Sequence, residues 1–229
     1  MYCSLTVGGF SFSGETVMDL AIIIHTVDSY NFLWSGWNYY FQKYWDFNID
    51  ASIYFMNEEA TVDFSNVKQI KTEKGPWSDR LINGLSQISE KNVFYMQEDF
   101  WLIKTLDKDF FESAFRFFIA NNMDAFRITI MGNYKLWPTM KFFKKHNVKR
   151  FNNRKSMYLV CHQASFWKKD FFLNCLLPNE TPWENEISGT ERIRKIRPKL
   201  YMIREHWYNE VCRKGEFTDI GEKMVKEVQ

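Results

Sequence analysis

The chain has 229 residues, 45% of them hydrophobic, and its 30 basic and 28 acidic residues leave a formal net charge of +2. A chain of this length can bury the core of a single domain with little left over. Because the charges nearly balance, no overall field exists that would attract nucleic acid. The composition therefore excludes a dedicated nucleic-acid-binding protein.

The four cysteines match neither a metal-binding nor a disulfide pattern. Cys3, Cys161, Cys175 and Cys212 are scattered without a CxxC pair, which is typical of reduced thiols in a cytosolic protein. No apolar run approaches the roughly 20 residues that a membrane-spanning helix needs, and the N-terminus lacks the pattern of a secretory signal. We therefore expect a cytoplasmic protein without a transmembrane segment, for which peripheral contact with the inner face of a membrane stays open.

Residues 1–17 differ in character from the rest of the chain. They are rich in Gly, Ser and Thr and lack helical periodicity, whereas Met18 stands directly before the first long apolar run. We expect residues 1–17 to be either a poorly ordered extension or the product of a start upstream of Met18, and residues 18–229 to form one domain.

From residue 19 onward, the patterns predict strands and helices in alternation. The first run, DLAIIIHT over residues 19–26, is continuously apolar, which is typical of a strand buried on both faces of a sheet. The full set comprises strands at 19–26, 51–56, 93–96, 125–130 and 157–161 and helices at 31–45, 77–88 (with Ser78 as its N-cap) and 110–121. This alternation predicts an α/β domain with a mainly parallel central sheet flanked by helices.

Polar residues gather directly after three of the predicted strands. They are His25, Thr26 and Asp28 after the first strand, Gln97, Glu98 and Asp99 after the strand at 93–96, and His162 with Gln163 after the strand at 157–161. Ligands of open α/β sheets bind beyond the carboxyl ends of the strands. The three clusters are therefore the first candidates for a functional site.

Glu98 and Asp99 form the most specific of these clusters. Two adjacent carboxylates at the end of a buried strand repel one another unless a cation or hydrogen-bond donors compensate them. Mg²⁺ or Mn²⁺ bound by one or two carboxylates and by substrate phosphates would provide this compensation. The alternative on spacing alone is a strand end that turns into solvent, where both groups are hydrated.

The segment from Gly75 to Trp101, GPWSDRLINGLSQISEKNVFYMQEDFW, resembles the part of GT-A-type glycosyltransferases in which a helix leads to a strand that ends in the DxD metal motif. It is similar in particular to small glycosyltransferase-like proteins of bacterial polysaccharide loci and large viruses. The similarity continues in HQASFWKKDFF (162–172), in PWENEI (182–187) and loosely in HWYNEVCRKGEFT (206–218). It covers most of residues 19–218 and implies a single GT-A-like, Rossmann-like domain.

The resemblance also implies where a nucleotide-sugar donor binds. The residues that it places there are His25, Thr26, Asp28, Ser78, Arg80, Gln97, Glu98 and Asp99. Arg80 has a physical argument of its own, because a guanidinium at the start of a helix can pair with phosphate oxygens. Its alternative is a surface pair with the neighbouring Asp79.

The implied metal, Mn²⁺ or Mg²⁺, depends on a motif that departs from the family pattern. Asp99 matches the second Asp of DxD, but Gln97 stands where the first would be. A neutral amide is a poorer metal ligand than a carboxylate, so Glu98 is the candidate substitute, and His206 is a candidate third ligand. The alternative for His206 is a structural role.

In PWENEI, the resemblance implies the catalytic base of an inverting transfer. Glu184 and Glu186 are two residues apart and lie on different faces of a helix, so only one can point at the reaction centre, and Glu184 matches the family position best. The alternative for Glu184 is a residue of the first helical turn that is favoured there by the helix dipole. Trp183 would stack on a sugar, with His162 and Gln163 lining the sugar or acceptor site. The basic residues farther along, Arg192, Arg194, Lys195, Arg197 and Lys199, are either a solvated helix face or a group that neutralises the departing diphosphate.

These expectations describe a glycosyltransferase that moves a sugar from a nucleotide diphosphate to a glycan or lipid-linked acceptor. A nucleotidyltransferase is disfavoured, because no Gly-rich, lysine-bearing phosphate loop occurs near the N-terminus. A non-catalytic protein that binds carbohydrate or nucleotide sugar on the same fold is the alternative, and Gln97 is the main observation in its favour.

Overall fold

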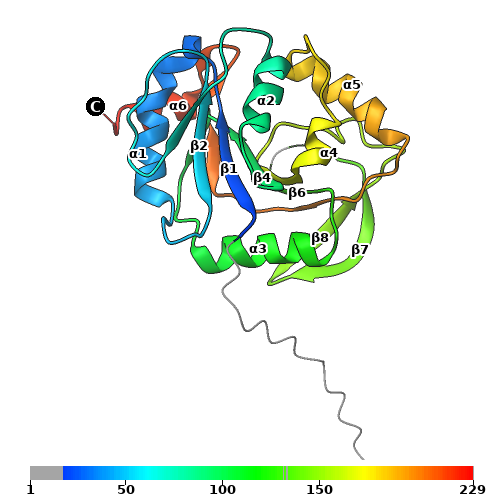
Figure 1. Cartoon of the computed structure of the whole chain (residues 1–229). Coiled ribbons are helices and arrows are strands. Elements are labelled where there is room, and N and C mark those ends of the chain that lie inside the picture. Colours follow the sequence, from blue (N-terminus) through cyan, green and yellow to red (C-terminus); the bar gives the residue numbers. More distant parts are fainter. Residues whose placement is uncertain (1–17, 131, 133, 229) are drawn as a thin grey trace, which may run out of the picture.

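The computed structural model describes residues 18–228 except residues 131 and 133 (Figure 1). The predicted extension, residues 1–17, lies outside the described residues.

A nine-stranded sheet forms the centre of the fold, in the strand order β3-β2-β1-β4-β9-β6-β10-β8-β7. Its strands are β1 (Leu20–His25), β2 (Ser52–Asn57), β3 (Lys68–Lys71), β4 (Asn92–Gln97), β6 (Ala125–Ile128), β7 (Leu136–Phe143), β8 (His146–Phe151), β9 (Ser165–Lys168) and β10 (Leu200–Ile203). Within this sheet, β8 and β9 run against the others. The prediction of a mainly parallel α/β sheet is confirmed.

Helices cover both faces of this sheet (Figure 1). Packed on one face are α1 (Trp34–Tyr44), α3 (Lys108–Ala120) and α6 (Asp219–Val225), and on the other α2 (Trp77–Ser86), α4 (Lys169–Leu173) and α5 (Pro182–Arg194). Strand β1 contributes side chains to the cores on both faces of the sheet, which explains its continuously apolar sequence. Ile22 and Ile24 lie in the core under α1, α3 and α6, and Ala21 and Ile23 lie in the core under α2, α4 and α5. A strand buried on both faces cannot alternate with polar residues.

Two short ribbons extend the fold beyond the end of β4. β5 (Phe100–Leu102) pairs with β11 (Tyr208–Glu210), and β12 (Cys212–Arg213) pairs with β13 (Glu216–Phe217). Helix α1 follows a 3-10 turn, η1 (Asp28–Leu33), and packs on β5. Gly36 of α1 allows this close approach, because a Cβ atom there would lie 2.0 Å from the Trp101 ring.

The strand predicted over residues 157–161 is wrong. This segment is not a strand but runs along α5, where the Leu159 and Val160 amides each donate to Thr190 Oγ1 at 3.0 Å. The strand that enters the sheet is β9, which lies antiparallel between β4 and β6. Because β9 is reversed, its amino end meets the carboxyl ends of β1 and β4, so His162 and Gln163 still reach the predicted edge.

Other elements agree with the sequence apart from their ends. The helices and strands predicted from residue 19 to 130 are present, whereas the strands predicted from the sequence did not include β3 or the β7–β8 hairpin. Ser78 is not a helix cap, because Pro76 is the N-cap of α2 and Ser78 lies inside the helix.

No helix in the described part of the chain is long and apolar enough to cross a membrane.

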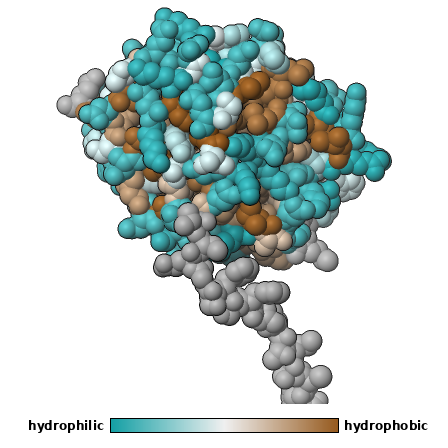
Figure 2. All heavy atoms as spheres, in the orientation of Figure 1, coloured by the Kyte–Doolittle hydropathy of each residue, from teal (hydrophilic) through white to brown (hydrophobic). Residues whose placement is uncertain are grey.

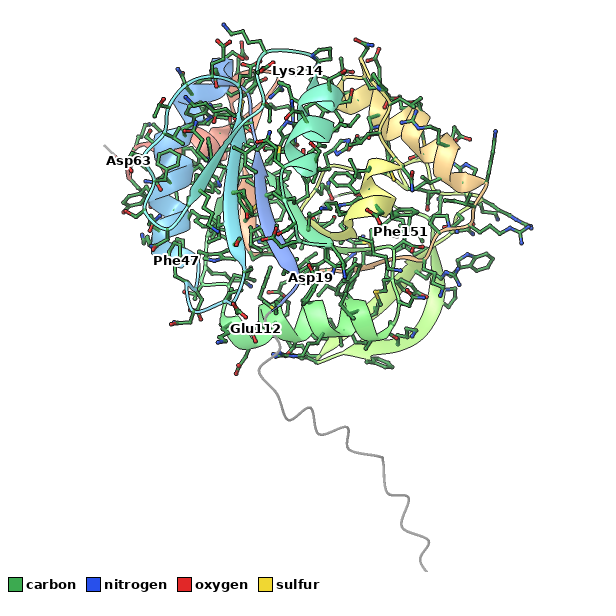
Figure 3. The ribbon with its side chains drawn as sticks, in the orientation of Figure 1. Asp19, Phe47, Asp63, Glu112, Phe151 and Lys214 are labelled. Atoms are coloured by element: carbon green, nitrogen blue, oxygen red, sulfur yellow. The ribbon has the colours of Figure 1, made fainter. Side chains whose placement is uncertain are left out.

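Figures 2 and 3 share the orientation of Figure 1. In Figure 3, Asp19 marks the amino edge of the sheet, below, and Lys214 lies at the opposite, carboxyl edge. The visible surface is mostly hydrophilic, with hydrophobic patches gathered over the region of α4 and α5 (Figure 2).

Candidate functional site

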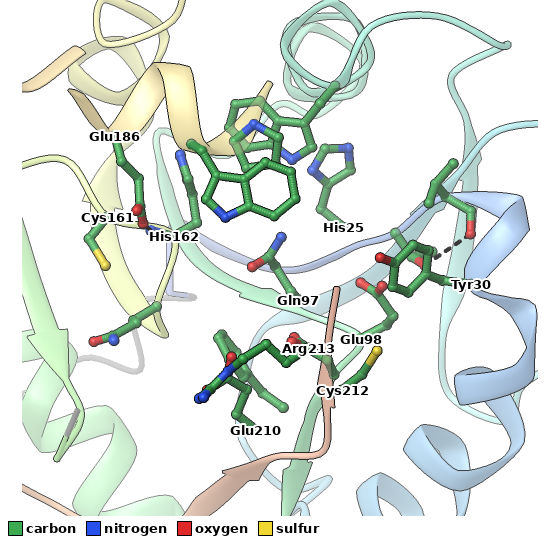
Figure 4. A pocket seen from close by; sticks show the side chains of 18 of the residues that line it. His25, Tyr30, Gln97, Glu98, Cys161, His162, Glu186, Glu210, Cys212 and Arg213 are labelled. Carbon is green, nitrogen blue, oxygen red and sulfur yellow. Dashed lines mark hydrogen bonds and ion pairs between the residues drawn. The ribbon is translucent and has the colours of Figure 1, made fainter. Parts of the chain in front are cut away.

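A cavity of about 840 Å³ lies at the carboxyl edge of the sheet. It is bounded by the ends of β1 and β4, the start of α5 and the segment from β11 to β12. Figure 4 shows labelled side chains from each of these elements pointing into it. Of the predicted site residues, those that line it are His25, Thr26, Arg80, Gln97, Glu98, Asp99, His162, Gln163, Trp183 and Glu186.

Glu98 and Asp99, the acid pair, lie in this cavity directly after β4. Burial is the main cause that raises the pKa of Glu98 to about 7, although Arg80 and Thr26 act in the opposite direction. Burial and the neighbouring charge of Glu98 raise the pKa of Asp99 well above its ordinary value. Asp99 Oδ1 is buried and has no hydrogen-bond partner among the described residues. The negative charge of the pair is therefore under-compensated, which means that too few hydrogen-bond donors or cations surround it. This is expected of carboxyl groups that bind a cation or a hydrogen-bond donor.

Two neighbouring carboxyl groups with raised pKa values fit a divalent-cation site, because the charge of the cation would allow both groups to ionise. A hard cation held by one or two carboxylates and by ligand phosphates is the usual arrangement. Within residues 18–228, apart from 131 and 133, no three or more His, Cys, Asp or Glu side chains come together to hold a metal. His206 is exposed, bonds Asn209 Oδ1 at 3.0 Å through Nε2, and does not line the cavity. The structure thus brings together the two predicted carboxylate ligands but not the histidine.

Two buried histidines flank the indole of Trp77 on the α2 side of the cavity. The ring centroid of Trp77 lies 5.7 Å from that of His25 and 4.4 Å from that of His162. Burial, then the charge of Arg80, lowers the pKa of His25, and burial lowers that of His162 to about 3. His25 Nε2 and both ring nitrogens of His162 have no hydrogen-bond partner among the described residues. These neutral rings can therefore bond a polar ligand.

Glu184 and Glu186 point in different directions, as their spacing predicts, but the one that faces the cavity is Glu186. Its Oε1 accepts a hydrogen bond of 3.0 Å from the His162 amide. Glu184 is exposed and closes a capping box with Thr181, whose amide donates to Glu184 Oε2 at 2.8 Å. Hydrogen bonds to the backbone and to the side chain of Thr181 lower the pKa of Glu184. The favoured position for a base is thus occupied by a helix cap.

Asp28 organises the loop after β2 instead of facing the cavity. Its carboxylate accepts four hydrogen bonds, from the Asn57 side chain and from the amides of Glu58, Glu59 and Ala60, at 2.7 to 3.2 Å. Burial alone would raise the pKa of Asp28, but these donors outweigh it and lower the pKa. A carboxylate saturated in this way has little capacity left for a ligand.

Ser78 and Arg80 on α2 also make internal contacts. The buried Ser78 hydroxyl accepts from the Glu180 amide at 2.9 Å and does not line the cavity. Arg80 does line it, but its Nη1 donates to the Thr26 carbonyl at 2.6 Å and its Nε lies 3.8 Å from Glu58 Oε1. The alternative of a surface pair with Asp79 is wrong, because the ion-pair partner of this buried guanidinium is Glu58. Contact between Arg80 and a phosphate stays a prediction.

Two of the five basic residues after PWENEI, Arg192 and Arg194, stabilise the fold. Arg192 pairs with Glu180 at 2.7 Å, and Arg194 pairs with Glu191 at 2.9 Å and also bonds the Ser156 carbonyl. None of the five residues of this run, 192–199, lines the cavity. A role in neutralising a bound diphosphate has no support in this geometry.

Several cavity residues had no assigned role in the sequence. They are Tyr30, Trp77, Tyr134, Tyr158, Cys161, Glu210, Cys212, Arg213 and Lys214. The last four lie in HWYNEVCRKGEFT, the weakest part of the resemblance, so that segment was the available signal. Gln163 is held toward this group by the Tyr134 hydroxyl, which donates to its Oε1 at 3.0 Å.

No family model matches the chain, and no curated protein matches it. Among solved structures, it is similar to S. aureus TarS 1-349, with a TM-score of 0.56, 15% identity and coverage of 83% of this chain and 60% of that one. It is similar to GalNAc-T7, with a TM-score of 0.56, 11% identity and coverage of 83% and 43%. It is also similar to a UGPase from Acinetobacter baumannii, with a TM-score of 0.56, 8% identity and coverage of 92% of both chains.

These similarities show a fold and not an activity. The chain has a GT-A-type glycosyltransferase fold, as the resemblance implies. It spans 60% of the TarS chain and 43% of the GalNAc-T7 chain.

Proposed function

We propose that this chain is a glycosyltransferase that uses a nucleotide-diphosphate sugar. The observation that carries the proposal is the acid pair, in which the buried Glu98 and the half-buried Asp99 lie under-compensated in the cavity at the carboxyl edge of the sheet. Such an arrangement costs folding free energy, and an anionic ligand bound together with a cation would remove that cost.

Glu98 and Asp99 would hold Mg²⁺ or Mn²⁺ at the place where the donor's diphosphate binds. When bound, the cation supplies positive charge that stabilises the diphosphate as a leaving group. The nucleoside would extend toward Thr26, Val27 and Tyr30, which line the β1 side of the cavity. Gln97 would then serve as a hydrogen-bonding neighbour of the site and not as a metal ligand.

Glu186 is our candidate for the catalytic base of an inverting transfer. The acceptor hydroxyl would attack the anomeric carbon from the face opposite the diphosphate, and the bond from that carbon to the diphosphate oxygen would break. Glu186 would take the hydroxyl proton. The His162 amide, which donates to Glu186 Oε1, orients this carboxylate, while Trp183 at the mouth, 64% exposed, offers a flat face for a sugar ring.

Two structures of the same fold were solved with ligands of the proposed class. TarS 1-349 was crystallised in complex with UDP-GlcNAc, and GalNAc-T7 with UDP, GalNAc and Mn²⁺. Their ligands support a donor of this class, and we propose a glycan or lipid-linked acceptor for the transfer.

The proposal is tested by measuring thermal unfolding with UDP- and GDP-sugars, each with and without Mn²⁺. A ligand that binds only the folded state raises its apparent stability, so we expect a rise in Tm that needs both the nucleotide and the cation. Equal Tm values with and without every nucleotide sugar would overturn the proposal.

Two other functions are separated by their products. The UGPase similarity covers 92% of both chains, and a nucleotidyltransferase would release pyrophosphate from a nucleoside triphosphate and a sugar phosphate. A non-catalytic binding protein would show the Tm rise but neither transfer nor hydrolysis of the donor. Sugar transfer without pyrophosphate release is the result that we expect.

A further inference from the structure

The loop over residues 152–158 and helix α5 lie side by side and form one surface, which we call the α5 ridge (152–158 and 183–197). At one end, Arg194 Nη2 donates to the Ser156 carbonyl at 3.0 Å. Farther along, the Leu159 and Val160 amides bond Thr190, and at the cavity the His162 amide bonds Glu186. The ridge therefore runs from the cavity mouth to the C-terminal end of α5.

Large apolar side chains are exposed along this ridge. Of the thirteen exposed large hydrophobic residues in the described part of the chain, five lie on it, namely Met157, Tyr158, Trp183, Ile187 and Ile196. Met157 is 74% exposed and Ile187 62%. Tyr158 and Trp183 also line the cavity, so this apolar surface continues into the mouth of the site. Clustering of this kind marks an interaction surface more often than scattered exposed residues do.

Cations without ionic partners lie at the other end of the ridge. Arg154, Lys155, Lys195 and Arg197 are exposed, and none forms an ion pair among the described residues. The sequence adds to this asymmetry, since residues 125–169 contain eleven Lys and Arg and no Asp or Glu, although the whole chain carries only +2. The positive charge is thus concentrated in the segment from which the loop of the ridge comes.

We propose that the α5 ridge docks on a lipid bilayer that contains anionic lipids. Exposed aromatic and aliphatic side chains beside unpaired cations match the two parts of such a surface, because the apolar groups enter the interface and the cations attract the headgroups. Docking would turn the cavity mouth toward the bilayer. If the proposed function holds, the acceptor is therefore a lipid-linked glycan and not a free one.

The β7–β8 hairpin is the competing surface and supplies a matched control. It also carries exposed aromatic residues, Trp137 and Phe142, near Lys145 and Lys149. However, none of these four residues lines the cavity. Docking through the hairpin would give the reaction site no access to the lipid.

The test is flotation of the full chain with vesicles of phosphatidylcholine alone or with phosphatidylglycerol added. We expect binding to the anionic vesicles, weakened roughly 25-fold by Lys155→Gln combined with Lys195→Gln, since each cation near such a surface contributes about a factor of five. Met157→Ser combined with Ile187→Ser should weaken it roughly tenfold. The control pairs, Lys145→Gln with Lys149→Gln and Trp137→Ser with Phe142→Ser, should leave binding unchanged.

All four pairs change exposed or half-buried side chains, and circular dichroism would verify that each variant folds. No binding to anionic vesicles, or loss of binding only in the hairpin variants, overturns the proposal. Binding to a soluble polyanion but not to vesicles would overturn it as well. Vesicle binding does not need the nucleotide, so a chain that binds vesicles but no nucleotide sugar would refute the proposed function alone.

Discussion

Asp28 and Asp99 follow two neighbouring strands at the same edge of the sheet, but their surroundings are opposite. Asp28 accepts four hydrogen bonds and has a lowered pKa, whereas Asp99 has a buried oxygen without a partner among the described residues and a raised pKa. The first carboxylate stabilises a loop, and the second is left with capacity for a ligand. Position at a strand end is therefore not enough to identify a functional carboxylate, because the donors around it decide its role.

The largest effect should come from the two glutamates of α5, which repeat this contrast. We expect Glu186→Gln to lower the turnover of sugar transfer by roughly 10²- to 10⁴-fold with little change in donor affinity, because the amide cannot accept the proton. Glu184→Gln should change turnover little, since Glu184 serves the helix cap. Turnover and donor affinity would be measured separately for both variants. Loss of turnover in Glu184→Gln alone would return the base to the position that the sequence favoured.

The next effect concerns Asp99 itself. Asp99→Asn should weaken Mn²⁺-dependent nucleotide binding by at least about 100-fold, because a neutral amide replaces a carboxylate ligand. Gln97→Ala should weaken it much less. Calorimetric titration with and without Mn²⁺ gives both affinities. Unchanged metal dependence in Asp99→Asn would move the cation site elsewhere.

Asp28→Ala should act on stability and not on binding. It leaves the donors of Asn57, Glu58, Glu59 and Ala60 without their acceptor, and we expect the free energy of unfolding to fall by about 2 kcal/mol. Urea unfolding measures this loss, and nucleotide affinity of the folded variant should stay within a fewfold of the parent. A large loss of affinity with unchanged stability would place Asp28 in the binding site.

The smallest effect is a dependence of stability on pH. The pKa of Glu98 is about 7 in the folded chain against 4.5 for an unperturbed group. Ionised Glu98 therefore destabilises the ligand-free fold above pH 7, and this destabilisation disappears as pH falls toward 4.5. At pH 8, Glu98→Gln should therefore be more stable than the parent by about 1–2 kcal/mol. This difference should shrink at pH 5. The comparison with the parent cancels the opposite effect of His25 and His162, whose neutral forms are favoured by burial.

If Glu98→Gln were equally stable or less stable than the parent at pH 8, the acid pair would not be under-compensated. The main argument for a ligand at this place would then be lost.

Much of the fold could be predicted from the sequence, because its signals are local. The continuous apolar run of β1, the helical spacing of α1 and the acid pair after β4 each depend on a few consecutive residues. The strand predicted at 157–161 failed for the same reason, since a short apolar stretch is equally compatible with a buried loop. Its amides are satisfied by Thr190, some thirty residues away, and nothing local indicates that partner.

The order of residues along the chain was sufficient for the α/β class, for the sheet edge at which polar groups meet and for the adjacency of Glu98 and Asp99. Which carboxylates keep free capacity depended instead on how the chain folds. Glu184 is bonded to Thr181 in the helix cap, and Asp28 is bonded to the Asn57–Ala60 loop, so neither faces the cavity. Glu186 does face it. A residue type sets what a side chain can bond, whereas the donors that reach it come from distant parts of the chain.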